Sequence, residues 1–248
     1  MVLPPFQNLE RCAIFLDFDG TLVEIEEHPE AVRMDASTLR LLSALHEGAN
    51  GALAIVSGRE IAVVDRFLHP LRLPVAGVHG MQRRDAYGEL HTRADFDLKP
   101  TIIVLEKRFA DAQGVVIERK RGAVAMHYRL RPDLEDECRK AAEEIVEINP
   151  KLRLLRGKMV FEIAQSACDK GGAISAFLSE PPFKGRIPLF AGDDLTDEHG
   201  FLVVNARGGV SIKIGNERSA AKYSAANVGE LKNWLSACVF ERFKEHAG

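Results

Sequence analysis

Runs of consecutive apolar residues alternate along this chain with stretches whose apolar residues recur at helical spacing. The apolar runs predict short buried strands at 12–16, 52–56, 74–78 and 187–191, and we expect another strand at 210–214. Between the first two runs, Leu39, Leu42 and Leu45 share one face of a predicted helix, which Asp35 or Ser37 can cap. Because buried strands that alternate with helices form parallel sheets, these parts of the chain predict an α/β domain.

The pattern changes between residues 96 and 164. Here two charged helices, at 100–112 and 132–148, each precede a pair of strands joined by a tight turn. The predicted strands lie at 115–120, 124–129, 152–155 and 159–163. This order favours an antiparallel sheet with helices on one face. We therefore expect an inserted α+β domain at 96–164 within a core formed by 1–95 and 165–248.

Apolar and polar residues alternate on the strands of the inserted unit. The apolar face carries Val124, Met126, Tyr128, Met159, Phe161 and Ile163. The opposite face carries Glu118, Lys120, His127, Arg129 and Glu162, with Lys158 at its edge. A polar sheet face is usually solvated, but its donors and acceptors would also suit a hydroxyl-rich ligand. The alternation by itself leaves both interpretations open.

Composition narrows the class of protein. With 46% hydrophobic and 28% charged residues, the 248-residue chain is typical of a globular enzyme. A net charge of -3 gives no reason to expect a nucleic-acid partner. Four cysteines lie far apart, which favours reduced thiols over a zinc site. The sequence shows no signal-peptide pattern. Its apolar runs are all much shorter than the ~20 residues that a membrane helix needs. We therefore expect a cytoplasmic protein without a membrane partner.

The first predicted strand ends in two carboxylates and a glycine, Asp17, Asp19 and Gly20. In parallel sheets, sites form just beyond the carboxyl ends of strands. Two carboxylates that converge there repel each other unless a cation or a shared proton separates them. Mg²⁺ is the simpler solution, because it commonly takes one or two carboxylates and a substrate phosphate. The alternative is an Asp-rich turn in which Gly20 supplies an unusual backbone angle.

Three more polar clusters follow predicted strands or begin a helix. Ser57 and Gly58 come before a helix, where a hydroxyl and a flexible backbone suit an anion. Lys170 stands at a helix start, where positive charge favours phosphate. Acids that can complete a metal site follow the strand at 187–191, namely Asp193, Asp194 and Asp197. Taken singly, these features also fit a capping serine, an exposed lysine and a capped helix start.

In their order along the chain, the clusters resemble the four motifs of the haloacid dehalogenase superfamily. Asp17 to Leu22 is similar to the first motif, Ser57 to the second and Lys170 to the third, and 192–197 to the fourth. P-type ATPases of this superfamily have Thr at the position of Asp19, so the second acid favours a phosphatase or a mutase. The resemblance implies a Rossmann-like parallel-sheet α/β core with an inserted α+β cap domain of the C2B type.

Within the superfamily, the motifs look like those of the trehalose-6-phosphate phosphatases. The similar segments are Ser57-Gly58-Arg59, Gly77-Val78-His79-Gly80, Glu118-x-Lys120, His127-Tyr128-Arg129, Gly157-Lys158-x-x-Phe161-Glu162-Ile163 and Gly192-Asp193-Asp194-x-Thr196-Asp197-Glu198. That family grips its disaccharide with the polar cap residues selected above by alternation. The resemblance therefore implies substrate-binding roles for Glu118, Lys120, His127, Arg129, Lys158 and Glu162.

The resemblance further implies magnesium-dependent hydrolysis of trehalose 6-phosphate through an aspartyl-phosphate. Asp17 would attack phosphorus, and Asp19 would protonate the leaving sugar oxygen and then activate water. The implied Mg²⁺ ligands are the carboxylates of Asp17 and Asp193 and the backbone carbonyl of Asp19. The implied phosphate-binding residues are Ser57, Gly58 and the catalytic Lys170. The residues implied to support them are Asp194 and Asp197.

Other functions fit parts of the same pattern. A related capped phosphatase could act on sucrose phosphate or mannosyl-3-phosphoglycerate, and a phosphomutase has similar motifs. A sugar-phosphate sensor without catalysis is a further alternative, although the four catalytic-type positions Asp17, Asp19, Lys170 and Asp193 are all intact.

Overall fold

The computed structural model describes residues 3–5, 8–25, 32–92, 97–120, 122–149, 151–157, 159–165 and 169–245, with only the backbone for residues 120, 165 and 241–245. These residues form two compact units. One comprises the described residues up to Thr92 and from Asp169 onward, and the other comprises those in between. In the described part of the chain, no helix is long and apolar enough to cross a membrane.

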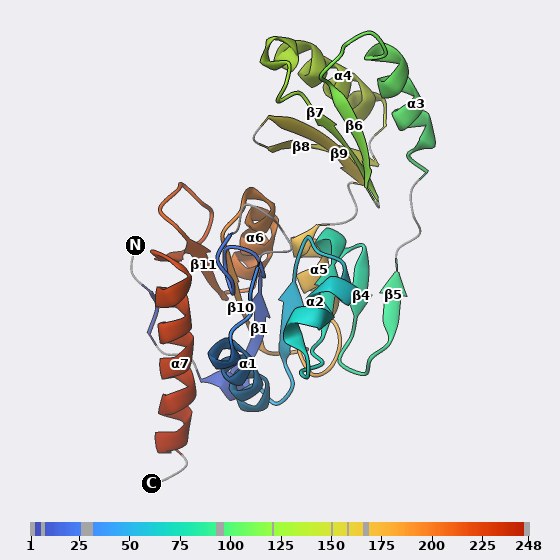
Figure 1. Ribbon diagram of the computed structural model, residues 1–248. Helices are drawn as coiled ribbons and strands as arrows, with labels where there is room; N and C mark the ends of the chain where they lie inside the picture. The colour runs from blue at the N-terminus through green and yellow to red at the C-terminus, as the bar shows by residue number, and fades with distance from the viewer. Residues whose placement is uncertain are drawn as a thin grey trace. The chain divides into compact units, whose positions relative to one another are not determined.

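The first unit is built on an eight-stranded sheet in the order β12-β11-β10-β1-β2-β3-β4-β5 (Figure 1). Six neighbouring strands are parallel: β12 (Tyr223–Ala225), β11 (Val210–Ile214), β10 (Ile187–Gly192), β1 (Cys12–Leu16), β2 (Leu53–Val56) and β3 (Val75–Gly77). Every residue of β1 and β2 is buried. Because successive side chains point to opposite faces of a sheet, both faces are covered, which explains the continuous apolar runs.

Helices of this unit are α1 (Ala36–Gly48), α2 (Ile61–Leu68), α5 (Lys170–Phe177), α6 (Glu198–Ala206) and α7 (Val228–Glu245). Of the two predicted caps of α1, Asp35 is the one used, since its side chain accepts from the Thr38 amide at 2.6 Å. Helix α1 packs against α7, and α5 packs against α6.

An aromatic cluster fixes α5 to the central strand. The Phe15 ring on β1 lies 6.0 Å from that of Phe177 on α5 and 5.5 Å from that of Phe183, measured between centroids. All three side chains are fully buried. Because β1 leads into Asp17 and α5 begins at Lys170, this packing holds together two segments that carry predicted site residues.

The second unit has the predicted element order. It consists of α3 (Lys99–Arg108), β6 (Val116–Lys120), β7 (Ala123–His127), α4 (Glu135–Ile148), β8 (Leu152–Gly157) and β9 (Val160–Gln165). Its strands form an antiparallel sheet in the order β6-β7-β9-β8. Val124, Met126 and Tyr128 are buried in its core together with residues of α3 and α4. This confirms the mixed α/β fold class and the apolar face inferred from alternation.

Several details differ from the prediction. Met159 lies in the turn before β9, with φ of 60° and 36% exposure, rather than on the apolar face. The segment Pro132–Leu134 forms a 3-10 turn, so α4 begins later than expected. An antiparallel hairpin of β4 (Gln82–Arg84) and β5 (Leu90–Thr92) extends the core sheet. Neither this hairpin nor β12 was predicted. These three strands are only three residues long, too short for a clear apolar pattern.

Candidate active site

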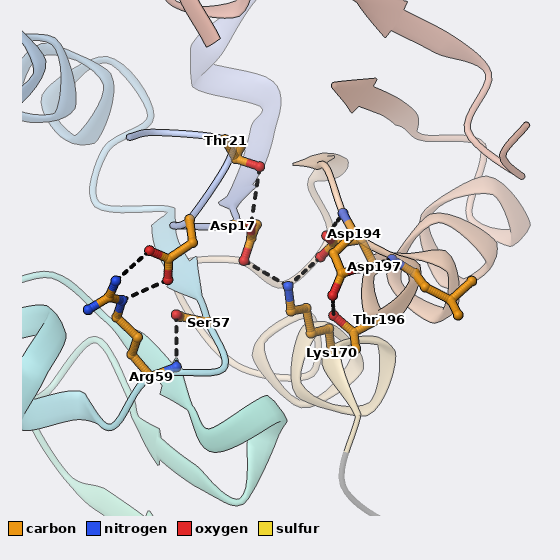
Figure 2. A network of polar contacts seen from close by, with 10 residues as sticks. Asp17, Thr21, Ser57, Arg59, Lys170, Asp194, Thr196 and Asp197 are labelled. Atoms are coloured by element: carbon orange, nitrogen blue, oxygen red, sulfur yellow. Dashed lines mark hydrogen bonds and ion pairs between the residues drawn. The ribbon is translucent and has the colours of Figure 1, made fainter. Parts of the chain in front are cut away.

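The ends of three parallel strands and the start of α5 bring the predicted catalytic residues together (Figure 2). Asp17 follows β1, Ser57 follows β2, Asp193 follows β10, and Lys170 is the first residue of α5. Asp17, Asp193 and Lys170 border a cavity of about 450 Å³. Its lining residues are Asp17, Asp19, Ile25, Val32, Gly58, Arg59, His79, Lys170, Asp193, Asp194 and Thr196.

Lys170 is buried between two carboxylates. Its Nζ donates to Asp17 Oδ1 and to Asp197 Oδ1, each at 2.7 Å (Figure 2). Burial opposes the charge of the ammonium group, but the two carboxylates outweigh it and hold the pKa of Lys170 above its usual value. A fixed positive charge therefore lies beside the carboxylate of Asp17.

Carboxylate oxygens from Asp17, Asp193 and Asp197 lie within 4.8 Å of one another. Burial raises the pKa of Asp193 to about 8, and the nearby carboxylates of Asp17 and Asp197 add to the shift. Burial and Asp17 likewise raise the pKa of Asp197 to about 7. Crowded acids with raised pKa values and only oxygen donors fit a hard divalent cation, which would relieve their repulsion.

Both carboxylate oxygens of Asp197 accept hydrogen bonds from other residues of the site. Oδ1 accepts from Lys170, and Oδ2 accepts from the Asp194 amide at 2.9 Å. The Asp194 side chain accepts from the Leu195 amide at 2.7 Å and thereby begins the 3-10 turn Leu195–Asp197. Asp197 thus links the loop after β10 to the lysine of α5.

Two glycines make room for these acids. Gly20 has φ of 74°, and a Cβ atom there would lie 2.0 Å from Asp193 Oδ2. A Cβ atom at Gly192 would lie 2.3 Å from Asp197 Cγ. Since real Cβ atoms do not approach other atoms so closely, each glycine lets a carboxylate lie against the backbone.

Asp19 is paired with Arg59 and does not join the acid cluster. Arg59 Nε donates to Asp19 Oδ2 at 2.7 Å, and Arg59 Nη2 donates to Asp19 Oδ1 at 2.6 Å. The Arg59 amide donates to Ser57 Oγ at 3.0 Å (Figure 2). Ser57 itself is buried, whereas Gly58 borders the cavity.

The predicted sugar-binding residues belong to the second unit. Glu118, His127 and Glu162 lie on the sheet face opposite its apolar core, and His127 Nε2 is 2.7 Å from Glu118 Oε2. Arg129 is exposed just beyond β7. The side chain of Lys120 and the whole of Lys158 lie outside the described residues.

Sequence reasoning assigned no role to two residues that contact the predicted catalytic acids. Thr21 Oγ1 donates to Asp17 Oδ2 at 3.1 Å, and Arg59 binds Asp19. Both stand inside motifs that the sequence displays, immediately after Gly20 and Gly58, so their proximity in the chain was an available signal. His79, named above only within the segment Gly77-Val78-His79-Gly80, lines the cavity with a left-handed backbone at φ of 52°.

Comparison with known proteins places these features in a family. The trehalose-phosphatase family model matches residues 15–232. A trehalose-6-phosphate phosphatase of Escherichia coli (strain K12) is 43% identical over 225 residues, which cover 90% of this chain and 85% of that protein. The crystal structure of a trehalose-6-phosphate phosphatase related protein is similar with a TM-score of 0.69 and 30% identity, covering 94% of this chain and 99% of that one.

Proteins outside this family have the same fold. A haloacid dehalogenase-like hydrolase from B. subtilis has a TM-score of 0.66 at 14% identity, covering 91% of this chain and 99% of that one. This likeness confirms the expected haloacid dehalogenase fold. Two findings establish the family as well as the fold: the family model matches most of the chain, and a relative that bears the family's name is 43% identical. This chain belongs to the trehalose-phosphatase family.

Proposed function

We propose that this protein is a magnesium-dependent phosphatase that hydrolyses trehalose 6-phosphate to trehalose and phosphate. The observation that carries the proposal is the Asp17–Lys170 pair beside Asp193 in a cavity of a trehalose-phosphatase family member. A buried carboxylate beside a fixed ammonium group and a further acid suits a nucleophile directed at a phosphate. The family relationship supplies the substrate class.

In the first step, an oxygen of Asp17 attacks phosphorus in line with the sugar oxygen. The new Asp17 oxygen–phosphorus bond forms as the phosphorus–sugar oxygen bond breaks, and Asp19 donates a proton to the departing sugar hydroxyl. In the second step, water attacks phosphorus and the bond to Asp17 breaks. Asp19 takes the water proton, so both residues return to their starting states.

Positive groups balance the charge on the transferring phosphoryl group. Lys170 binds its non-bridging oxygens, and the Ser57 hydroxyl and Gly58 backbone contribute hydrogen bonds. The carboxylates of Asp17 and Asp193 and the carbonyl of Asp19 would hold Mg²⁺, which when bound offsets the repulsion between nucleophile and phosphate. Asp194 and Asp197 keep the loop after β10 and Lys170 in place.

We assign sugar recognition to the polar face of the second unit. Its residues are Glu118, Lys120, His127, Arg129, Lys158 and Glu162. Carboxylates accept hydrogen bonds from sugar hydroxyls, and the cationic side chains donate to them. A sugar with misplaced hydroxyls would leave such groups unpaired, which makes a site of this kind selective.

A substrate panel tests the proposal. Phosphate release is measured with Mg²⁺ on trehalose 6-phosphate, sucrose 6-phosphate, glucose 6-phosphate and mannosyl-3-phosphoglycerate, each with and without EDTA. We expect a strong preference for trehalose 6-phosphate that EDTA abolishes and added Mg²⁺ restores. Preference for another substrate would refute the assigned sugar specificity, while activity that resists EDTA would refute the metal site. No hydrolysis by folded protein would favour a sensor.

A further inference from the structure

Arg59 connects the loop after β2 to Asp19 through two nearly parallel hydrogen bonds. The donor–acceptor distances are 2.7 Å from Nε and 2.6 Å from Nη2, one to each carboxylate oxygen. A guanidinium group that binds both oxygens of a carboxylate fixes its orientation as well as its location. Asp19 is otherwise a partly exposed side chain, with 38% of its surface accessible.

The guanidinium group is itself held from several directions. Its Cζ lies 5.6 Å from the Phe18 ring centroid and 5.3 Å from that of Phe67, and the Arg59 side chain is only 15% exposed. Phe18 stands between Asp17 and Asp19, and Phe67 belongs to α2. The Arg59 backbone is bound too, because its carbonyl accepts from the Val78 amide at 2.9 Å. The arginine is therefore a fixed support rather than a mobile surface side chain.

We propose that Arg59 is the positioning residue for Asp19, an inference that rests on the acid–base role of Asp19 in the proposed function. Asp19 has to meet the leaving sugar oxygen in one step and the attacking water in the next. A misplacement of about 1 Å at such a group costs a rate factor of about 100. A guanidinium group offers no hydrogen-bond acceptor, so Arg59 cannot replace Asp19 in proton transfer and acts through it.

A different role for Arg59 makes a different prediction. Because Arg59 borders the cavity, its guanidinium group could instead bind the substrate phosphate directly. Loss of a direct contact would raise KM, and it would have the same effect whether or not Asp19 is present. Loss of positioning lowers kcat and depends on Asp19. A double-mutant cycle separates the two roles.

The experiment compares Arg59→Met, Asp19→Asn and the double variant on trehalose 6-phosphate, and repeats the series on p-nitrophenyl phosphate. Arg59→Met should lower kcat about tenfold to a hundredfold and change KM less than about threefold. Added to Asp19→Asn, it should lower kcat by less than about threefold further. Arg59→Lys should lie between the wild type and Arg59→Met, because lysine keeps the charge but loses the fork.

Arg83 provides a matched control elsewhere in the same unit. Its guanidinium Cζ lies 5.0 Å from the Phe177 ring centroid, it pairs with Glu180, and its side chain is 13% exposed. Arg83→Met therefore removes an ion pair and a ring contact of the same kind. We expect both methionine variants to lose similar stability in urea unfolding and only Arg59→Met to lose kcat.

The outcomes distinguish this inference from the proposed function. An active wild type whose kcat survives Arg59→Met, or whose double variant shows the full product of both losses, would overturn the role of Arg59 alone. A wild type that hydrolyses only p-nitrophenyl phosphate would refute the trehalose substrate, while the same cycle on that compound still tests Arg59. A folded wild type inactive on both compounds would overturn both.

Discussion

At the scale of single residues, the location of the Asp193 carboxylate depends on the absence of a side chain at Gly20. The left-handed backbone of Gly20, with φ of 74°, turns the chain between Asp19 and Thr21. Asp193 Oδ2 occupies the space that a Cβ atom of residue 20 would need. The glycine therefore serves both the turn after β1 and the acid that follows β10.

Gly20→Ala tests this dependence. The added methyl group must displace Asp193, and we expect about a hundredfold loss of kcat/KM together with weaker Mg²⁺ binding. Gly88→Ala is the control, because Gly88 has a similar φ of 90° but no atom within 4 Å of its added Cβ. Both variants bear about 1–2 kcal/mol of backbone strain. Equal activities for the two variants would contradict the role assigned to the Gly20–Asp193 contact.

The acids and the lysine of the site could be found from sequence because each follows a buried strand or begins a helix. Their pairing could not be predicted, since Lys170 is 153 residues from Asp17 and contacts it only because α5 packs on β1. The same limit applies to Arg59. Its bond to Asp19 joins the loops after two neighbouring strands, and nothing local to either segment predicts which residue it contacts.

At the scale of elements, strand register in the second unit creates two separated acids on one face. Glu118 and Glu162 are the register neighbours of Ala125 on either side. Neighbouring strands lie about 4.8 Å apart, so the backbones of these two residues, with Ala125 between them, are roughly 10 Å from each other. Two hydrogen-bond acceptors on separate strands of one face suit a ligand with several hydroxyl groups.

Glu162→Ala tests the proposed sugar recognition. If Glu162 binds a sugar hydroxyl, its loss should lower kcat/KM on trehalose 6-phosphate about tenfold to a hundredfold, mainly through KM. Hydrolysis of p-nitrophenyl phosphate, which has no sugar, should be unchanged. Glu106→Ala is the control in the same unit, since Glu106 of α3 pairs with Arg119 at 2.8 Å. Parallel losses on both substrates would show that Glu162 has no specific part in sugar binding.

Elements differ in how well the sequence predicts them, and burial explains the difference. Strands β1, β10 and β11 were predicted within one residue of their bounds because β1 and β10 are continuous apolar runs and β11 alternates apolar with polar residues. Strand β5 is exposed along its whole length, and β4 carries Arg83 and Arg84. Buried Arg84 is tolerated because Asp65 and the Leu73 carbonyl bind it, and these are partners that only the tertiary structure supplies.

At the scale of the whole molecule, the chain has a net charge of -3, although the site proposed above binds a negatively charged sugar phosphate. Lys170 supplies a local positive charge, but Asp17, Asp193 and Asp197 surround it with an excess of acid. Without a cation, burial and the neighbouring carboxylates favour the protonated forms of Asp193 and Asp197, whose pKa values are raised. The stability of the metal-free protein should therefore depend on pH.

The sign of this dependence follows from comparing folded and unfolded states. Asp193 has a pKa of about 8 in the folded chain and an ordinary value of 3.8 when unfolded, so the folded state binds its proton more tightly. Its stabilising contribution is complete below pH 3.8 and is lost as pH rises through about 8. Asp197 acts in the same direction. Lys170 adds no slope below pH 8, because it is protonated in both states there.

Urea unfolding in EDTA at pH 5.5, 6.5 and 7.5 on the wild type and Asp193→Asn measures the effect. The wild type should lose up to about 1 kcal/mol per pH unit more than the variant, since only the wild type must release the Asp193 proton. Asp197 titrates in both proteins and largely cancels in the comparison. Saturating Mg²⁺ should stabilise the wild type increasingly as pH rises, because the ion binds ionised carboxylates. Unfolding free energies that change in parallel would show that Asp193 is ionised without a metal, and that the cluster does not need a cation to relieve its charge.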